Sequence, residues 1–290
     1  MAKERKSSTK SAGVRRIGSS SSRSKATGVD SERRAFPPRD RSLGGDQIEG
    51  RQSVRELLQA RRRKTREVWI SDSVERVGIV EEIIDLALKA RVPVLTVAKA
   101  KLDRAARSES SQGIVAFAEK LGEVALDQLV EPYKGAKPFL IVLDGVTDPY
   151  NLGAIMRSAE CAGATGVLLP EHRSVHMTPA ATKAAAGAIE HLRFALVPGI
   201  PAALQDLSKA GVWCVGLDSD ASQSIYDVSL FDQPVALIFG AEGRGLSTLT
   251  KQRCDVLAAI PQYGQIQSLN VSNAAALAMF EVARARLRAL

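Results

Sequence analysis

QYGQIQSLNVSNAAALAM, residues Gln262–Met279, directly follows the apolar run at residues 256–260. The pattern predicts a buried strand, a polar loop and an alanine-rich helix within about two dozen residues. The loop is dense in uncharged hydrogen-bonding side chains, namely Gln265, Gln267, Ser268, Asn270, Ser272 and Asn273. Asn270 or Ser272 could simply cap the helix by accepting backbone N–H groups. This stretch alone leaves a helix cap and a functional loop both open, and partner motifs elsewhere must decide between them.

A second motif follows the predicted strand at residues 139–143 and reads DGVTDPYNLGAIMRSAECAG, residues Asp144–Gly163. Asp148 and Pro149 should end the strand, and Asn151 is expected to cap a helix with apolar residues at helical spacing. Arg157 comes six residues after Asn151, under two turns later, so both side chains are expected to address the carboxyl end of the strand. Most helix arginines are merely solvated, so that interpretation of Arg157 stays open.

A third motif follows the apolar run PVALIF at residues 234–239, which is typical of a strand buried on both faces. GAEGRGLS, residues Gly240–Ser247, has glycines that permit positive φ and a close approach of ligand to backbone. A dinucleotide-binding loop would read G-x-G-x-x-G after a first strand, whereas this loop has the order G-x-x-G-x-G after a late one. Glu242 could be a carboxylate without a role, but its place inside the loop favours a functional one.

The three motifs together resemble the signatures of the SpoU/TrmH family of RNA ribose 2′-O-methyltransferases, within the SPOUT superfamily. Residues 151–159 fit N-x-G-A-x-x-R-x-A, residues 240–246 fit G-x-E-x-x-G-L, and residues 268–272 read S-L-N-V-S. The resemblance covers residues 137–290 and implies an α/β fold, a Rossmann-like parallel sheet with a deep C-terminal trefoil knot. It further implies S-adenosyl-L-methionine as cofactor, no metal, and a homodimer through the knot and the helix expected at residues 271–290.

The same resemblance assigns roles to individual residues. It implies a catalytic group that comprises Arg157, Asn151, Glu242, Ser268 and Asn270. It implies a cofactor site, bound mostly through backbone groups, that comprises Gly216, Leu217, Gly240, Ala241, Glu242, Ile260, Gln267, Ser268 and Leu269. Arg157 would orient an RNA phosphate and stabilise charge, since a permanently charged guanidinium is a poor free base. Pro198-Gly199 replaces an Asn that many relatives carry after the third strand.

Residues 46–121 are expected to form a separate α/β domain that binds the RNA substrate. EGRQSVRELL at residues 49–58 and SQGIVAF at residues 111–117 resemble the ribosomal-protein-like (L30e-like) domain of many family members, although Ser111 replaces a frequent His. The basic run between the first helix and strand predicts phosphate contacts, with a solvated loop as the alternative, and comprises Arg61, Arg62, Arg63, Lys64 and Arg66. Residues 122–136 are expected to be a linker to the catalytic domain at residues 137–290.

Residues 1–45 contain 12 Lys and Arg and 4 Asp and Glu, a surplus that equals the whole chain's net charge of +8. The segment is rich in Ser, Gly and Arg and poor in large apolar residues, so a disordered basic arm that binds phosphates is expected. A solubilising extension and an organellar transit peptide are the alternatives, although the segment lacks the amphipathic stripe of a transit peptide.

The rest of the composition indicates a cytoplasmic protein without metal or membrane span. No run of 18 apolar residues occurs, and the three cysteines are scattered and odd in number. Cys161 is expected to pack on the apolar side of its helix. His172, His176 and His191 have no neighbouring cysteine or carboxylate cluster of the kind that binds metal.

These features predict S-adenosylmethionine-dependent 2′-O-methylation of a nucleotide, a guanosine in 23S rRNA, because the extra amino-terminal domain is typical of that group within the family. The same chemistry on tRNA or on the thiostrepton-resistance rRNA loop is one alternative. A non-catalytic RNA-binding assembly factor is another, and the intact set of implied catalytic residues argues against it.

Overall fold

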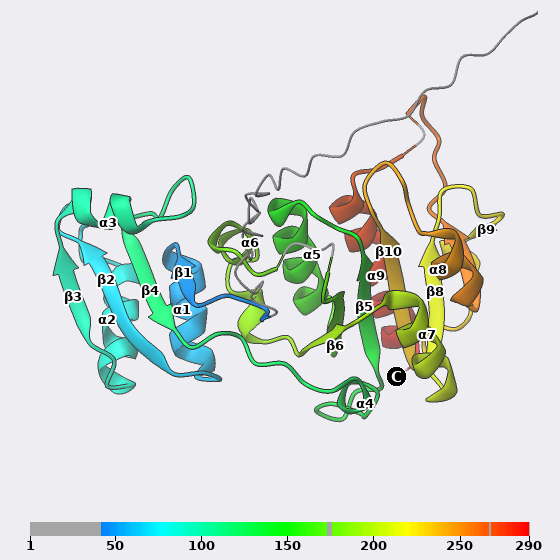
Figure 1. Ribbon diagram of the computed structural model, residues 1–290, viewed down its shortest axis with the longest axis horizontal. Coiled ribbons are helices and arrows are strands. Elements are labelled where there is room, and N and C mark those ends of the chain that lie inside the picture. The colour runs from blue at the N-terminus through cyan, green and yellow to red at the C-terminus, as the bar shows by residue number, and fades with distance from the viewer. Residues whose placement is uncertain (1–41, 173–175, 267, 290) are drawn as a thin grey trace, which may run out of the picture. The chain divides into compact units, whose positions relative to one another are not determined.

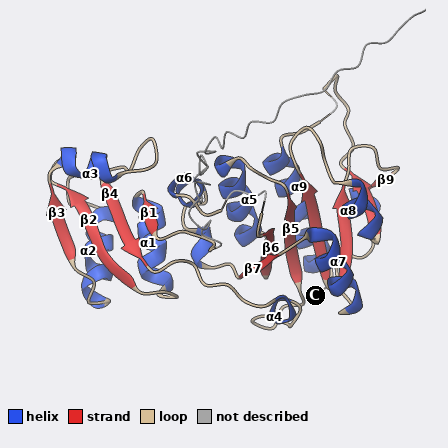
Figure 2. Ribbon diagram, in the orientation of Figure 1, coloured by secondary structure: helices blue, strands red, loops and turns tan. Residues whose placement is uncertain are grey.

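The computed structural model describes residues 42–172, 176–266 and 268–289. Its strands form two separate sheets, each accompanied by helices (Figures 1 and 2). The predicted basic arm lies, up to residue 41, outside the described residues. The elements β1 to β4 with α1 to α3 are called the small domain, and those from β5 onward the large domain.

The small domain has a four-stranded sheet in the order β1-β4-β2-β3. β2 and β3 are parallel, and β4 runs antiparallel to both β1 and β2. Its strands are β1 (Gln47–Glu49), β2 (Thr65–Ser71), β3 (Val94–Val97) and β4 (Ile114–Ala118). Its helices are α1 (Arg51–Ala60), α2 (Ile79–Lys89) and α3 (Lys99–Ala105).

The apolar stripe of α1 explains where this helix packs. Val54, Leu57 and Leu58 recur on one face and are fully buried in a core shared with Ile83 of α2 and Ile70 of β2. α1 and α2 therefore cover the same face of the small sheet.

The large domain has a seven-stranded sheet in the order β7-β6-β5-β10-β8-β11-β9, in which every neighbouring pair is parallel. Its strands are β5 (Phe139–Asp144), β6 (Gly166–Pro170), β7 (Phe194–Val197), β8 (Trp213–Leu217), β9 (Gln223–Ser224), β10 (Val235–Gly240) and β11 (Val256–Ala259). After β5, the chain adds β6 and then β7 on one side of β5. It then crosses the sheet to form β8 on the other side of β5. The carboxyl ends of β5 and β10 therefore flank the point where the strand order reverses, which is where open α/β sheets bind ligands.

Helices cover both faces of this sheet. They are α4 (Leu126–Leu129), α5 (Pro149–Cys161), α6 (Pro179–Ala184), α7 (Ile200–Lys209), α8 (Thr248–Arg253) and α9 (Val271–Arg288), with short 3-10 turns η1 (Ala188–Glu190) and η2 (Ile225–Asp227). Side chains of α5, α6 and α9 share one core with one face of the sheet, and those of α4 and α7 share a second core with the other.

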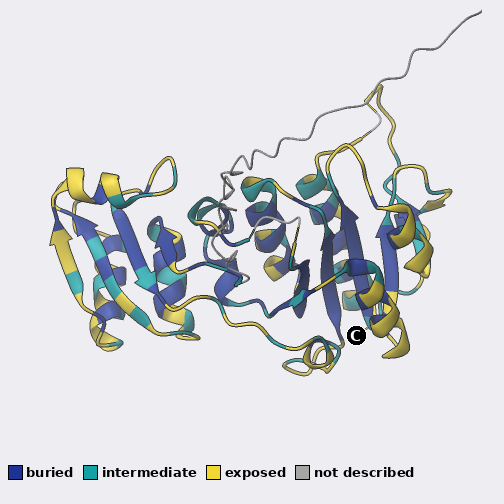
Figure 3. Cartoon of the chain, in the orientation of Figure 1, coloured by how far each residue is buried: buried dark blue, intermediate teal, exposed yellow. Residues whose placement is uncertain are grey.

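The alternation of β5 shows how the two cores arise. Phe139, Ile141 and Leu143 enter the first core, whereas Leu140 and Val142 enter the second. Successive side chains of a strand point to opposite faces, so a continuous apolar run is required when both faces are covered. Figure 3 shows these central strands as buried, in contrast to the exposed outer surfaces of the helices.

The structure moves two boundaries that the sequence predicted. Leu43 is fully buried in the first core of the large domain, and its carbonyl accepts from the N–H of Met177 at 2.8 Å. Residues 43–45, assigned to the arm, therefore belong to the folded body. Within the predicted linker, residues 126–129 form α4, and Leu129 is fully buried in the second core.

Two local predictions on α5 were wrong. The helix begins at Pro149 with Asp148 as its cap, because a proline at the first helical position needs no N–H partner and Asp148 Oδ1 accepts from the Asn151 N–H at 2.8 Å. Asn151 therefore lies inside the first turn instead of capping it. Cys161 is exposed instead of packed, because it is the last residue of the helix.

Candidate active site

Three polar side chains from distant parts of the chain meet at the carboxyl edge of the large sheet. The Asn151 amide Nδ2 donates to Glu242 Oε1 at 2.5 Å. The Asn270 amide Nδ2 donates to Asn151 Oδ1 at 3.1 Å and to Glu242 Oε1 at 3.2 Å. Asn151, Glu242 and Asn270, called the amide–carboxylate trio, were all predicted as catalytic. All three side chains remain accessible, so a bound molecule can reach them.

Asn151 reaches the trio because Asp148 has taken over the capping of α5. The Asp148 carboxylate accepts the backbone N–H of Asn151, so the Asn151 side chain is not needed by its own helix. It is then free to point across the sheet edge from the end of β5 toward the loop after β10.

Glu242 is presented by a loop that only glycine allows at its first position. A Cβ on Gly240 would lie 2.1 Å from the backbone of Gly245, because Ala241 and Gly245 pair with each other across the turn. Gly243 and Gly245 have φ of 73° and 66°, where other residues are strained. The helix that follows the loop is fixed to β5, because Asp144 at the end of β5 accepts from the Thr250 hydroxyl of α8 at 2.6 Å.

Asn270 caps α9 and also contacts the other two residues of the trio. Its Oδ1 accepts from the Ser272 N–H at 2.9 Å and from the Ser272 hydroxyl at 2.6 Å, so it caps α9. Its Nδ2 remains available and joins the trio. Capping fixes the orientation of the amide, and the amide then fixes the carboxylate of Glu242.

A cavity of about 520 Å³ opens beside the trio, in the size range of pockets for small molecules and cofactors. Most of the residues predicted to bind the cofactor line it, namely Leu217, Gly240, Ala241, Glu242, Ile260, Ser268 and Leu269. Gln267 lies outside the described residues. Gly216 does not line the cavity but is tightly packed in β8, where a Cβ would approach Cys254 Sγ to 2.7 Å. Pro198 and Gly199 lead into α7 and are likewise absent from the wall.

The sequence prediction missed an ion pair in the cavity wall. Asp218 follows β8, and its carboxylate binds the ammonium of Lys251 from α8. Burial raises the pKa of Asp218, but hydrogen bonds from Lys251 and from the Asp220 N–H lower it by more, so the pKa lies below its ordinary value. The cavity thus keeps a charged carboxylate at neutral pH. The only sequence signal was an acidic residue directly after a predicted strand.

Arg157 lies apart from the trio. It is exposed on α5, and within the described residues no hydrogen bond or ion pair joins it to Asn151, Glu242 or Asn270. Six residues of helix place Arg157 roughly 9 Å farther along the axis than Asn151. The guanidinium is therefore available to an outside partner.

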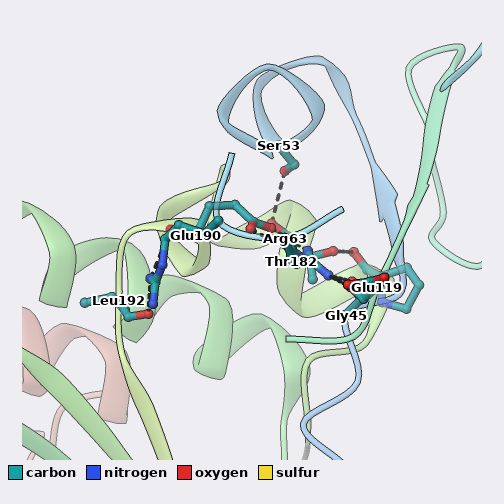
Figure 4. A network of polar contacts seen from close by, with 9 residues as sticks. Gly45, Ser53, Arg63, Glu119, Thr182, Glu190 and Leu192 are labelled. Atoms are coloured by element: carbon teal, nitrogen blue, oxygen red, sulfur yellow. Dashed lines mark hydrogen bonds and ion pairs between the residues drawn. The ribbon is translucent and has the colours of Figure 1, made fainter. Parts of the chain in front are cut away.

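Part of the predicted RNA-binding run is engaged within the protein (Figure 4). Arg63 forms an ion pair with Glu190, and the side chains of these residues are only 6% and 1% exposed. Arg62 donates to the carbonyl oxygens of Glu190 and Leu192 at 3.1 and 2.7 Å. Arg61, Lys64 and Arg66 are exposed and keep the predicted role open. Arg62 and Arg63 link the small domain to η1 and the segment that follows it.

Cysteine and histidine offer no alternative chemistry at this site. Burial raises the pKa of Cys214 and of Cys254 to about 12, so both thiols stay protonated and serve as packing. His191 binds Glu56 at 2.9 Å. Within the described ranges, no group of three His, Cys, Asp or Glu side chains is arranged to hold a metal ion. The trio can orient a polar substrate group beside a cavity whose wall contains the Asp218–Lys251 ion pair.

Comparison with protein families gives matches over both domains. Residues 138–280 match the SpoU rRNA Methylase family. Residues 47–124 match a family described as RNA 2′-O ribose methyltransferase substrate binding. The first match contains the whole trio, and the second contains the small sheet with its helices.

Individual relatives extend over nearly the same region. The 23S rRNA (guanosine-2′-O-)-methyltransferase RlmB of Pseudomonas putida is 37% identical over 83% of this chain and 97% of its own length. A solved RNA 2′-O ribose methyltransferase has a TM-score of 0.68 at 26% identity, covering 83% of this chain and 88% of its own. The SpoU methyltransferase AviRb from Streptomyces viridochromogenes, solved with AdoMet, has a TM-score of 0.70 at 23% identity, covering 83% and 90%, and so supports the fold alone.

Proposed function

The chain belongs to the SpoU rRNA methylase family, and from this premise we propose that it methylates a ribose 2′-hydroxyl, that of a guanosine, in 23S rRNA. S-adenosylmethionine is the methyl donor. The observation that carries the proposal is the amide–carboxylate trio, in which Asn151, Glu242 and Asn270 meet beside a cavity of cofactor size. Each of the three residues comes from a different family signature.

The residues around the cavity fit the cofactor. The strand ends and the glycine loop provide the backbone groups of Leu217, Gly240 and Ala241, and Asp218 provides a charged acceptor for hydroxyl or ammonium groups. When bound there, the cofactor supplies a methyl group already activated by its positive sulfur. The protein must then position the ribose hydroxyl in line with that methyl group and take up the hydroxyl proton.

Glu242 is suited to hold the hydroxyl, because both amides of the trio donate to its Oε1. In the described part of the chain, Oε2 of the same carboxylate accepts no hydrogen bond and can face the substrate. Formation of the bond between the hydroxyl oxygen and the methyl carbon would break the methyl–sulfur bond and release a neutral thioether, and the hydroxyl proton would pass to this carboxylate or to water. Asn151 and Asn270 fix the carboxylate, so little reorganisation is needed in the transition state.

Arg157 binds an RNA phosphate next to the target ribose. Its guanidinium is exposed and has no protein partner among the described residues, and its charge persists at any physiological pH. A bound phosphate would set the position of the ribose, so Arg157 acts through orientation and charge stabilisation.

The finer architecture follows the family as well. We infer that the chain after β11 passes through a neighbouring loop to form a trefoil knot and that the small domain is L30e-like. We also infer a homodimer through the knot and α9, supported by a group of exposed apolar side chains, namely Tyr263, Ile266, Leu277, Phe280 and Leu287. Sedimentation analysis of an active preparation would refute the dimer if only monomer were present.

Localisation in the cytoplasm belongs to the same proposal, because 23S rRNA is found there in bacteria. Of the helices that the structure describes, none has the length and apolar character needed to cross a bilayer.

The proposed function is tested by mapping 2′-O-methyl marks in RNA from cells with and without the protein. Loss of one mark in 23S rRNA, restored by the wild-type gene but not by an Asn151→Ala variant, is the expected result. Loss of a tRNA mark alone would move the substrate to tRNA, and an unchanged pattern in both RNAs would contradict the proposal.

A further inference from the structure

A second cavity, of about 470 Å³, opens on the small domain and shares no residue with the cavity beside the trio. Polar and charged side chains dominate its wall, namely Arg51, Ser71, Ser73, Lys99, Asp103 and Gln112. Its volume falls in the range of sites that take a nucleotide or a similar small molecule. Neither the trio nor the interdomain contacts use it.

The topology of the small sheet explains why these side chains gather. β1, β2 and β3 all run in one direction, because β4 is antiparallel to both β1 and β2 and β2 is parallel to β3. Arg51, Ser71 and Lys99 follow or end these strands, so they lie at one edge, near α3 and the turn into β4 (Figure 1). In open α/β sheets, ligands bind outside the carboxyl ends of the strands, and the carboxyl ends of β1, β2 and β3 share this edge.

The charges of the wall favour an anion with a polar group attached. Within the described residues, neither Arg51 nor Lys99 is in an ion pair with a carboxylate, unlike Arg63 on the same domain. Asp103 adds one acceptor, and the hydroxyls of Ser71 and Ser73, hydrogen-bonded to each other at 2.8 Å, leave one O–H group to donate. Arg51 Nε donates to the Gln112 carbonyl at 3.4 Å, which leaves the other N–H groups of its guanidinium for a ligand. Arg51 and Lys99 can together hold a phosphate, while Asp103 can accept from the N–H groups of a base.

One wall of the cavity is rigidly built. Gln112 and Gly113 are consecutive left-handed residues with φ of 54° and 73°. A Cβ on Gly113 would lie 2.2 Å from Val74 Cγ2, and the Gln112 side-chain oxygen is fixed by the Arg51 N–H at 3.0 Å. Among the described residues, nothing accepts from the side-chain amide nitrogen of Gln112, so this group can donate to a ligand. A non-glycine residue in this conformation is costly, and the surrounding contacts hold it in place.

We propose that this cavity binds a single unpaired nucleotide of the RNA substrate, with its phosphate on Arg51 and Lys99 and its base edge on Asp103 and Gln112. The proposal rests on the proposed function, because it takes RNA as the substrate. A duplex end is too wide for the cavity, whereas a base splayed out of a loop can enter it. The small domain would thereby select an RNA loop that also presents the target ribose to the trio.

The test compares RNA affinities of the full-length protein without cofactor. The variant Arg51→Gln with Lys99→Gln should bind a 23S rRNA fragment with unpaired loops about tenfold or more weakly. The dependence of log K on log salt should become shallower by roughly 0.7–1.4, the contribution of one or two phosphates in a single strand. The control Lys89→Gln with Arg91→Gln removes the same charge from exposed positions at the opposite edge of the small sheet, where α2 ends, and should change affinity less than twofold.

A second variant tests whether RNA binding needs the open space of the cavity, without a change in the net charge. Ser73→Tyr keeps the net charge and fills the cavity from an exposed position, so it should weaken binding to the looped fragment but leave binding to a perfect RNA duplex unchanged. Thermal unfolding checks that each variant is folded.

If the charge and filling variants both bind the looped RNA like the wild type, the cavity is not an RNA site, and this holds whether or not the protein methylates RNA. Equal losses in the two double variants would mean that charge alone attracts RNA and would also overturn the proposal. Failure of the wild type to methylate rRNA would instead remove the proposed function and leave the measured affinities to be judged alone.

Discussion

The side-chain amide of Asn151 donates to the carboxylate of Glu242 at 2.5 Å, although 91 residues separate them in the sequence. The contact joins the helix after β5 to the glycine loop after β10, and these two strands are neighbours in the sheet. Asn270 donates to both partners and closes the group. The positions of the three side chains therefore depend on one another.

Asn151→Ala should lower the rate of methyl transfer by roughly 10²-fold or more, because Glu242 loses its shorter hydrogen bond and its fixed orientation. Cofactor affinity should change little, because Asn151 does not line the cavity. Single-turnover kinetics with saturating RNA, together with calorimetry, measures the two effects. Asn273→Ala on the exposed side of α9 is the matched control. Equal rates for Asn151→Ala and its control would remove the trio from the mechanism.

Arg157→Ala should reduce methyl transfer by roughly 10²–10⁴-fold while leaving cofactor binding intact, because the guanidinium is exposed and outside the cavity wall. Arg157→Lys should restore little, since a point charge does not reproduce the guanidinium fork. Arg288→Ala, on an exposed helix position, is the control. Steady-state rates decide the matter, and near-normal turnover of Arg157→Ala would contradict the assigned role.

Asp218→Asn should weaken cofactor binding roughly tenfold or more, because a hydrogen bond to a charged acceptor contributes about 1.5–3 kcal/mol. The pKa of Asp218 is lowered in the folded state, so its contribution to stability is present above the unfolded pKa and is lost as pH falls through the folded value. The acid limb of a stability–pH curve should therefore be flatter for Asp218→Asn than for the wild type. Asp206→Asn, an exposed carboxylate on α7, is the control. Unchanged calorimetric affinity would exclude Asp218 from the cofactor site.

Removing residues 1–41 should leave the thermal midpoint and cofactor affinity unchanged and should weaken RNA binding. The slope of log K against log salt should become shallower by about 0.7–0.9 for each phosphate that the arm no longer neutralises. Removing residues 1–45 should in addition lower the free energy of unfolding by about 2 kcal/mol or more, because Leu43 is fully buried. Calorimetric melting and RNA titrations over a salt series compare the two truncations. Identical midpoints of the two truncations would show that Leu43 does not stabilise the folded domains. Identical salt slopes of the full-length protein and the 1–41 truncation would mean that the arm is only a solubilising segment.

The sequence predicted the large sheet well because its strands are continuous apolar runs, which are required where both faces are covered. The family resemblance implied a catalytic group that includes Asn151, Glu242 and Asn270, and the structure brings these three side chains into contact. Asp148 was overlooked as the cap of α5 because Asn151, three residues later, is an equally good capping residue by type.

Other features could not be predicted because they depend on contacts between distant segments. The ion pair between Lys251 and Asp218 forms only when α8 packs near the end of β8, and neither residue belongs to a sequence motif. The same holds for Arg63, whose buried partner Glu190 lies 127 residues away. A run of cations in a sequence does not reveal which of its members are neutralised inside the protein.

The methylation of 23S rRNA is tested most directly with the purified protein, S-adenosylmethionine that carries an isotopic methyl group, and an unmodified 23S rRNA transcript. Nuclease digestion and mass spectrometry then locate the label. We expect one labelled ribose 2′-oxygen, on a guanosine, and loss of that label in the Asn151→Ala and Arg157→Ala variants. A label on a base, or equal labelling by the wild type and both variants, would contradict it.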